Sequence, residues 1–200
     1  MGRGGTTADG TAGAGAELVP VLDPRAPVRA GAVVVDVQPR ARVRAGNLPH
    51  AATAVLLRDG AGRVAVHRRT TTKDVYPGAH DAVAGGVVCA GEDPDAAAAR
   101  ELAEELGVGA GVLLTPLRPV LRRWYRDDVT HYLAFAYEAW VAPGTELRAQ
   151  PSEVAEVWWE PAVRVRERLA DPGWAFVPDT RALLAAWPDW WNDPGVPDDR

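Results

Sequence analysis

Residues 85–108 read GGVVCAGEDPDAAAARELAEELGV, and this stretch decides the fold. Asp93 suits the cap that precedes a helix, Pro94 suits the first helical position, and the alanines that follow favour helix formation. Gly107 suits the residue just past the helix, where a left-handed backbone is common. The sequence therefore predicts a helix that begins at Pro94 and ends just before Gly107.

Three glutamates of this helix have the spacing i, i+3 and i+4, which places Glu101, Glu104 and Glu105 on one face. Like charges at this spacing cost about 0.2–0.5 kcal/mol per pair in an isolated helix. A bound cation would make the cluster favourable, and a solvated acidic face is the alternative. The side facing the core is expected to consist of Ala99, Leu102, Ala103 and Leu106.

Two neighbouring features favour a bound cation over a solvated acidic face. Gly85 and Gly86 permit a positive φ and let another group approach the backbone closely. Arg100 adjoins the glutamates and could hold one carboxylate through a bidentate bond.

With these residues in place, the stretch resembles the Nudix box at every defined position. The matching residues are Gly86, Glu92, Arg100, Glu101, Leu102, Glu104, Glu105, Gly107 and Val108. The flanking pattern of strands and a terminal helix is also similar to that family, so the resemblance covers about residues 47–190.

The resemblance implies an enzyme that binds Mg²⁺ or Mn²⁺ and hydrolyses a diphosphate joined to another moiety. It assigns the metal to Glu101, Glu104 and Glu105, with the Gly86 carbonyl as a further ligand. It makes Arg100 the residue that orients Glu101, and Glu92 a brace for the loop. Carboxylates, phosphates and water are the oxygen ligands that Mg²⁺ prefers. The general base stays open, and the candidates are Glu105, Glu153 and Glu156.

A second resemblance, carried by residues 67–86, is to isopentenyl-diphosphate isomerase and the Nudix hydrolases similar to it. Residues 47–50 and 177–180 fit the same subgroup. It implies that Arg68, Arg69 and Lys73 bind substrate phosphates, and a solvated basic loop is the alternative. The isomerase chemistry itself needs a cysteine and a histidine where this chain has Ala84 and Gly86, so hydrolysis is favoured over isomerisation.

A Nudix module that binds a ligand without cleaving it is the other alternative. Such modules often lose the catalytic glutamates, and this chain keeps them. For substrate contacts outside the box, Trp124 and Tyr125 are the expected aromatic residues. His80 and Cys89 are expected to be structural, and the late tryptophans to pack in the core.

Around the box, Val-rich and aromatic runs predict strands at 51–59, 63–69, 117–127, 129–141 and 153–160, and helices at 163–170 and 179–187. Residues 18–47 read as short edge strands or an extended arm. The order predicts an α/β (α+β) fold, an α/β/α sandwich with a mixed sheet. Residues 17–192 are expected to form one domain, with a disordered tail at 1–16 and a second tail at 193–200.

The bulk composition limits the partners. A net charge of −5 argues against binding a nucleic-acid polymer, which needs a basic surface. No apolar run reaches the ~20 residues that span a bilayer, so membrane association is not expected. One cysteine and no signal-peptide pattern favour the cytoplasm. Dimers are common among Nudix proteins, so a homodimer is one alternative, and the sequence leaves the oligomeric state open.

Overall fold

The computed structural model describes residues 17–28, 32–187, 189–192 and 195–196, so the two expected tails lie almost wholly outside the described residues. In chain order, the elements are β1 (Leu18–Leu22), β2 (Val34–Pro39), α1 (Arg40–Ala45), β3 (His50–Asp59), β4 (Arg63–Arg69), β5 (His80–Asp81), α2 (Pro94–Leu106), η3 (Ala110–Val112), β6 (Arg118–Arg126), β7 (His131–Val141), β8 (Val154–Pro161), α3 (Ala162–Leu169) and α4 (Pro178–Ala185).

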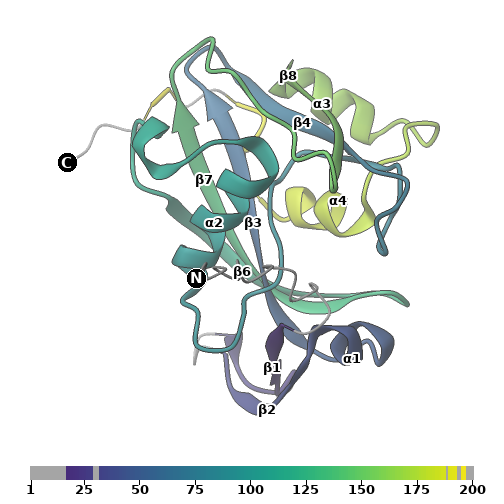
Figure 1. Ribbon diagram of the computed structural model, residues 1–200. Coiled ribbons are helices and arrows are strands. Elements are labelled where there is room, and N and C mark those ends of the chain that lie inside the picture. Colours follow the sequence, from purple (N-terminus) through teal and green to yellow (C-terminus); the bar gives the residue numbers. More distant parts are fainter. Residues whose placement is uncertain (1–16, 29–31, 188, 193–194, 197–200) are drawn as a thin grey trace, which may run out of the picture.

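A mixed sheet lies between two helical layers (Figure 1). Its strand order is β5-β4-β3-β7-β6, and β8 pairs with β4. Among the strand pairs of this sheet that the structure describes, β3–β7 is parallel and the others are antiparallel. On one face, α2 covers a core that contains Leu102, Leu106 and Val55. On the other face, α3 and α4 cover a second core that contains Val165 and Leu184. The chain therefore has the expected α/β/α sandwich.

The predicted turn between β3 and β4 is present, but the two strands separate directly after it. Their register holds a single pair, Arg58 opposite Val64. On their other edges, β3 pairs with β7 along ten residues, and β4 pairs with β8. The gap between the diverging strands is bridged by the segment that leads into the box, with Val55 opposite Ala84 and Ala52 opposite Val87. This divergence places the start of the box beside an open part of the sheet.

The N-terminal residues form more than an extended arm. β1 and β2 pair antiparallel as expected for edge strands, and the chain then turns into the short helix α1, which was not expected. Val43 of α1 packs with Val19 and Val21 of β1 and with Val87 of the box loop. This small apolar cluster fixes the N-terminal segment against the box.

Helix α2 begins and ends where the sequence predicts. Asp93 accepts a hydrogen bond from the Asp95 amide, and Gly107 has a φ of 71°. The expected core-facing side was wrong in part, because Ala103 is exposed. The buried side consists of Ala97, Ala98, Glu101, Leu102, Glu105 and Leu106. Two of the three glutamates therefore lie on the buried side of the helix, not opposite it.

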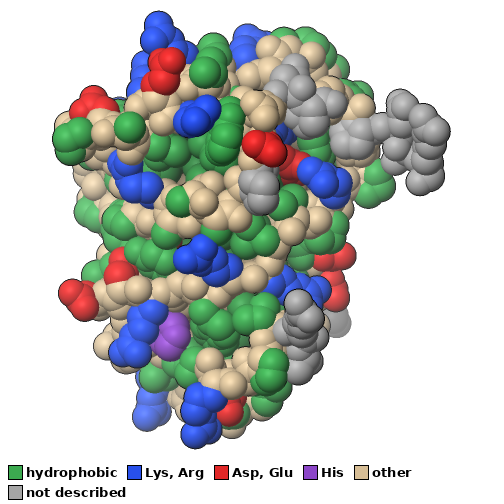
Figure 2. Space-filling view, turned by 180° about the vertical axis from the view of Figure 1, so that it is seen from behind, with side chains coloured by type: hydrophobic (Ala, Val, Ile, Leu, Met, Phe, Trp, Pro, Cys, Tyr) green, Lys and Arg blue, Asp and Glu red, His purple; other side chains and the backbone are tan. Residues whose placement is uncertain are grey.

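The surface opposite the view of Figure 1 carries interspersed positive and negative side chains between hydrophobic ones (Figure 2). This mixture accords with the modest net charge of −5. Over the described residues, no helix combines the length and apolar character needed to cross a membrane.

Candidate active site

A cavity of about 160 Å³ lies beside α2, between the box, β3 and α1. Its wall is unusually rich in charge. The acidic residues that line it are Glu17, Asp81, Glu101, Glu104, Glu153 and Asp179, and the basic ones are Arg40, Arg44, Arg69, Lys73 and Arg100. A cavity lined by both carboxylates and cations suits a ligand that carries both negative and positive charge, such as a phosphate with a metal ion.

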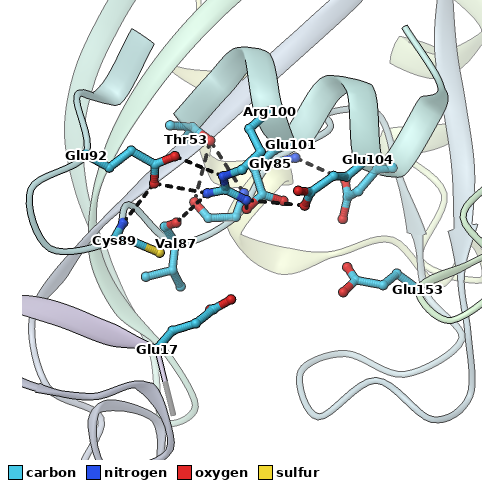
Figure 3. A network of polar contacts seen from close by, with 12 residues as sticks. Glu17, Thr53, Gly85, Val87, Cys89, Glu92, Arg100, Glu101, Glu104 and Glu153 are labelled. Carbon is cyan, nitrogen blue, oxygen red and sulfur yellow. Dashed lines mark hydrogen bonds and ion pairs between the residues drawn. The ribbon is translucent and has the colours of Figure 1, made fainter. Parts of the chain in front are cut away.

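Arg100 is the centre of a polar network in the box (Figure 3). Its Nε and Nη2 atoms donate to the two carboxylate oxygens of Glu92 at 2.9 and 3.1 Å. Its Nη1 atom donates to Glu101 at 2.7 Å and to Glu104 at 3.3 Å. Glu92 also accepts from the Cys89 amide at 3.0 Å. The bidentate bond thus goes to Glu92, which ties the box loop to the helix, while Glu101 and Glu104 are held by single bonds.

Gly85 and Gly86 are required by close packing. A Cβ at Gly85 would lie 2.0 Å from the Thr53 carbonyl oxygen, and one at Gly86 would lie 2.3 Å from Glu101 Oε1. Neither glycine has a positive φ, so that part of the expectation was wrong. The Gly86 carbonyl accepts a hydrogen bond from the Thr53 amide at 2.8 Å. The two glycines therefore let β3 and the Glu101 carboxylate approach the same short segment from opposite sides.

Glu101 and Glu105 are buried carboxyl groups. Burial raises the pKa of Glu101, and Arg100 offsets only part of that effect. Burial, together with the nearby Glu101 charge, raises the pKa of Glu105 from 4.5 to about 8. The Gly85 amide donates to Glu105 Oε2 at 3.1 Å. A carboxyl group kept in such surroundings is costly unless a cation or a proton neutralises it.

The donor set suits a hard divalent ion, but the carboxylates are not gathered around one point. Among the described residues, no three Asp, Glu, His or Cys side chains converge in a way that would hold a metal ion. Glu101, Glu104 and Glu153 present oxygens to the same cavity, and oxygen is the ligand that Mg²⁺ and Ca²⁺ prefer. Glu105 instead faces the Gly85 backbone outside the cavity lining. The chemistry of these residues fits an ion, and here Arg100 neutralises two of them.

The cations predicted for phosphate binding fall into two groups. Arg69 and Lys73 line the cavity, whereas Arg68 lies outside it, 3.7 Å from Glu156. Successive residues of a strand point to opposite faces, which separates Arg68 from Arg69. Lys73 Nζ lies 2.6 Å from Glu153 Oε2.

Of the two later candidates for the general base, one lines the cavity and the other does not. Burial opposes ionisation of Glu153, but Lys73 outweighs it and holds the pKa of this carboxyl below its ordinary value. Glu153 lines the cavity, and the Glu156 side chain is 61% exposed outside it. In Figure 3, the Glu153 carboxylate lies on the same side of the view as Glu104. Both residues line the cavity.

Sequence reasoning missed five charged residues of the cavity wall, which are Asp81, Asp179 and three in the N-terminal segment. Glu17 precedes β1, and Arg40 and Arg44 lie one turn apart on α1. Their spacing of four residues around the buried Val43 was the available signal. The missing information was that the N-terminal segment folds back against the box.

A second group of polar side chains lines the cavity away from the box. Tyr132 donates to Asp179 at 3.0 Å, and Asp81 accepts from the amides of Ala82 and Val83. Burial and the neighbouring Asp81 raise the pKa of Asp179 to about 6. This part of the wall offers acceptors and, below that pH, a carboxylic acid donor.

The aromatic prediction for substrate contact is not supported by position. Neither Trp124 nor Tyr125 belongs to the cavity lining, and Tyr125 donates to Asp127 at 3.0 Å. His80 is bonded to the Ala175 carbonyl and lies against Trp174, in keeping with a structural role. Cys89 is half-buried, less enclosed than expected.

Comparison with known proteins assigns the family. The family model described as the NUDIX domain matches residues 48–180. A Nudix hydrolase of Rhodococcus erythropolis, orf19, is 44% identical over 154 residues, which is 74% of this chain and 82% of that protein. YfcD, a Nudix hydrolase of Escherichia coli K12, is 38% identical over 148 residues, 74% of this chain and 77% of its own length.

The fold has a counterpart among solved structures. The crystal structure of DR0079 from Deinococcus radiodurans superposes with a TM-score of 0.67 at 23% identity, covering 86% of this chain and 99% of that one. At this identity the likeness supports the architecture alone. The family model and the sequence matches establish that the chain belongs to the Nudix hydrolase family, whose enzymes act on acid anhydrides of phosphorus.

Proposed function

We propose that this protein is a Mg²⁺- or Mn²⁺-dependent pyrophosphohydrolase. Its substrate would be a nucleoside diphosphate linked to another moiety, or a similar small diphosphate, and water would attack one phosphorus of the diphosphate. The observation that carries the proposal is that one cavity is lined both by the carboxylates Glu101 and Glu104 and by the cations Arg69 and Lys73.

When bound, a divalent ion would offset the charge that develops on the phosphoryl oxygens and would acidify a coordinated water. Glu101 and Glu104, which line the cavity, would hold that ion. The resemblance adds Glu105 and the Gly86 carbonyl, which here accept from the Gly85 and Thr53 amides. Arg100 would keep Glu101 in one orientation through its 2.7 Å bond. Arg69 and Lys73 would bind the phosphate oxygens, because charge-assisted hydrogen bonds are stronger than neutral ones.

Of the three candidates for the general base, we propose Glu153 as the residue that accepts the proton from the attacking water. Its carboxylate lines the cavity, and Lys73 favours the ionised form that a base needs. Glu105 is only 2% exposed and faces the Gly85 amide. Removing a general base typically costs about 10²–10⁴-fold in rate.

A screen of diphosphate compounds with Mg²⁺ and Mn²⁺ tests the proposal, with the phosphate products identified by chromatography. We expect hydrolysis by the wild type and a loss of at least 100-fold in the Glu104→Gln variant. Glu156→Gln is the matched control, since Glu156 is an exposed glutamate outside the cavity, and it should keep wild-type turnover. Equal activity in all three proteins would remove the box glutamates from the reaction.

The same screen separates an enzyme from a module that only binds. A binding module would take up a diphosphate compound without releasing product, in the wild type and the Glu104→Gln variant alike. The isomerase alternative needs a cysteine thiol at position 84, where this chain has Ala84, which is buried in the core beside β3. We place the reaction in the cytoplasm, in keeping with the single cysteine of the chain.

A further inference from the structure

Helix α1 brings two arginines to the cavity from outside the segment that matches the family model. That match begins at residue 48, and α1 spans Arg40–Ala45. Residues four apart lie on one face of a helix, and Arg40 and Arg44 both line the cavity. Val43, which is 1% exposed, anchors the helix in the apolar cluster with Val87. The two guanidinium groups are therefore held at the cavity wall by the packing of their own helix.

Arg44 has more hydrogen-bonding capacity than its surroundings use. Its Nε atom is buried and has no hydrogen-bond partner among the described residues. The same Nε atom lies 3.8 Å from Asp74 Oδ2, which is too long for a hydrogen bond, and the Asp74 side chain is 63% exposed. Burial and the positive charges of Arg40 and Arg69 lower the pKa of Arg44, while Asp74 acts in the opposite direction. A buried donor without a partner costs free energy. The Arg44 side chain lines the cavity and is 24% exposed, so an anion that enters the cavity can pair with its guanidinium charge.

We propose that Arg40 and Arg44 form a binding site for a terminal phosphate, so that the enzyme prefers diphosphates with a free end over compounds in which both phosphates are esterified. The inference rests on the proposed function and adds the class of substrate to it. A free terminal phosphate carries more negative charge and one more unesterified oxygen than a bridging phosphate. Two guanidinium groups on one helix face can bind both features through charge-assisted hydrogen bonds.

The size of the cavity agrees with this reading. Pockets that enclose drug-sized ligands have volumes of about 300–1,000 Å³. A cavity of about 160 Å³ is smaller and suits the phosphate groups of a substrate better than a whole nucleotide. Glu17 already pairs with Arg40 at 3.0 Å, so a terminal phosphate would share or displace that partner. The Glu17 side chain is 44% exposed, and an exposed pair of this kind is weak.

Calorimetry without divalent metal tests end recognition apart from hydrolysis. The probes are adenosine 5′-(α,β-methylene)diphosphate, which has a free terminal phosphonate, and ADP-ribose, in which both phosphates are esterified. We expect the wild type to bind the free-ended probe more tightly. Arg44→Met should weaken that binding by about 10- to 100-fold and leave ADP-ribose binding unchanged.

Arg42→Met is the matched control, because Arg42 lies on the same helix, is exposed and does not line the cavity. It should bind both probes as the wild type does. Thermal unfolding separates binding from a structural role: Arg44→Met should unfold at the wild-type temperature or above, since it removes a buried donor without a partner. A lowered unfolding temperature with unchanged binding would overturn the proposal.

Other results would also refute end recognition. One is that Arg44→Met loses equal binding affinity for the two probes. Another is that Arg42→Met loses as much affinity for the free-ended probe as Arg44→Met does, which would indicate only a general effect of positive charge. Failure of the wild type to bind either probe would overturn it as well. The hydrolysis screen with Mg²⁺ gives an independent answer on the proposed function, because turnover there does not depend on these metal-free measurements.

Discussion

The buried carboxyl of Glu105 makes the stability of the metal-free protein depend on pH, and replacing it with glutamine should remove that dependence. Glu105 is 2% exposed, and its pKa is raised from 4.5 to about 8. Between these values the folded protein holds a proton that the unfolded chain releases. The free energy of unfolding therefore falls as the pH rises from about 4.5 to about 8, and the loss is complete above that range.

The size of the effect follows from the shift. One pKa unit corresponds to about 1.36 kcal/mol. Retaining the proton at pH 7, 2.5 units above the ordinary pKa of 4.5, costs the folded state about 3 kcal/mol. The Glu105→Gln variant should be more stable than the wild type by about 1 kcal/mol at pH 5 and about 4 kcal/mol at pH 8. Glutamine keeps an acceptor for the Gly85 amide, which now donates to Glu105 Oε2 at 3.1 Å.

Urea unfolding in EDTA at pH 5, 6.5 and 8 measures this difference directly. Glu104→Gln is the matched control, since the Glu104 side chain is 49% exposed on the same helix. Substitutions at such sites usually change stability by less than about 0.5 kcal/mol. If the wild type and Glu105→Gln follow parallel lines across the three pH values, Glu105 does not hold a proton in the folded state, and the reasoning from burial is wrong.

Three further substitutions test other parts of the site and the core. Gly86→Ala should fold, with an unchanged circular dichroism spectrum, and lose about 100-fold in kcat/KM. Its Cβ would lie 2.3 Å from Glu101 Oε1 and would therefore displace that carboxylate. Wild-type kinetics would contradict that contact. Glu138→Ala should lower the free energy of unfolding by about 3–5 kcal/mol in urea, since it leaves the buried Arg58 unpaired; a change below 1 kcal/mol would contradict it. Leu102→Ala should cost about 2–5 kcal/mol by the same measurement, and a neutral result would show that this fully buried site can collapse.

The features that follow local rules were predictable from the sequence. The cap at Asp93, the proline at position 94 and the left-handed Gly107 fix the ends of α2 without help from the rest of the chain. The β6–β7 hairpin follows in the same way, because alternation within each strand and a short polar turn are properties of adjacent residues. The Nudix box joins these local signals to a function.

Long-range pairing was not predictable. The turn between β3 and β4 looked like a hairpin, yet the register ends after Arg58 and Val64. Past that pair, residues 84–87 bridge to the facing edge of β3, and β5 pairs with β4. A turn determines where the chain reverses, and the partner strands determine how far the pairing continues. The short helix α1 was missed because Pro39 precedes it without a side-chain cap and no heptad of apolar residues marks it.

Burial of charge was the other missing element. Glutamate is almost never fully buried, so a helical pattern with Glu101 and Glu105 on the acidic side predicts solvent for both. The structure places them against the sheet with Leu102. Gly85 and Gly86 indicated that some group approaches the backbone closely, but sequence alone does not say which group fills the space beside a glycine. In the structure, that group is the Glu101 carboxylate at Gly86.

Two unfavourable features of the protein lie near one cavity, one on an acidic side chain and one on a basic side chain. Glu105 is an acid that burial forces to hold a proton, and Arg44 is a base with a buried donor that has no hydrogen-bond partner among the described residues. Neither contributes to stability, and a divalent cation would relieve the first as a phosphate would relieve the second. A metal–diphosphate complex carries both charges in one ligand. Local departures from favourable packing concentrate at functional sites, and here each departure is matched to one half of the ligand that we propose.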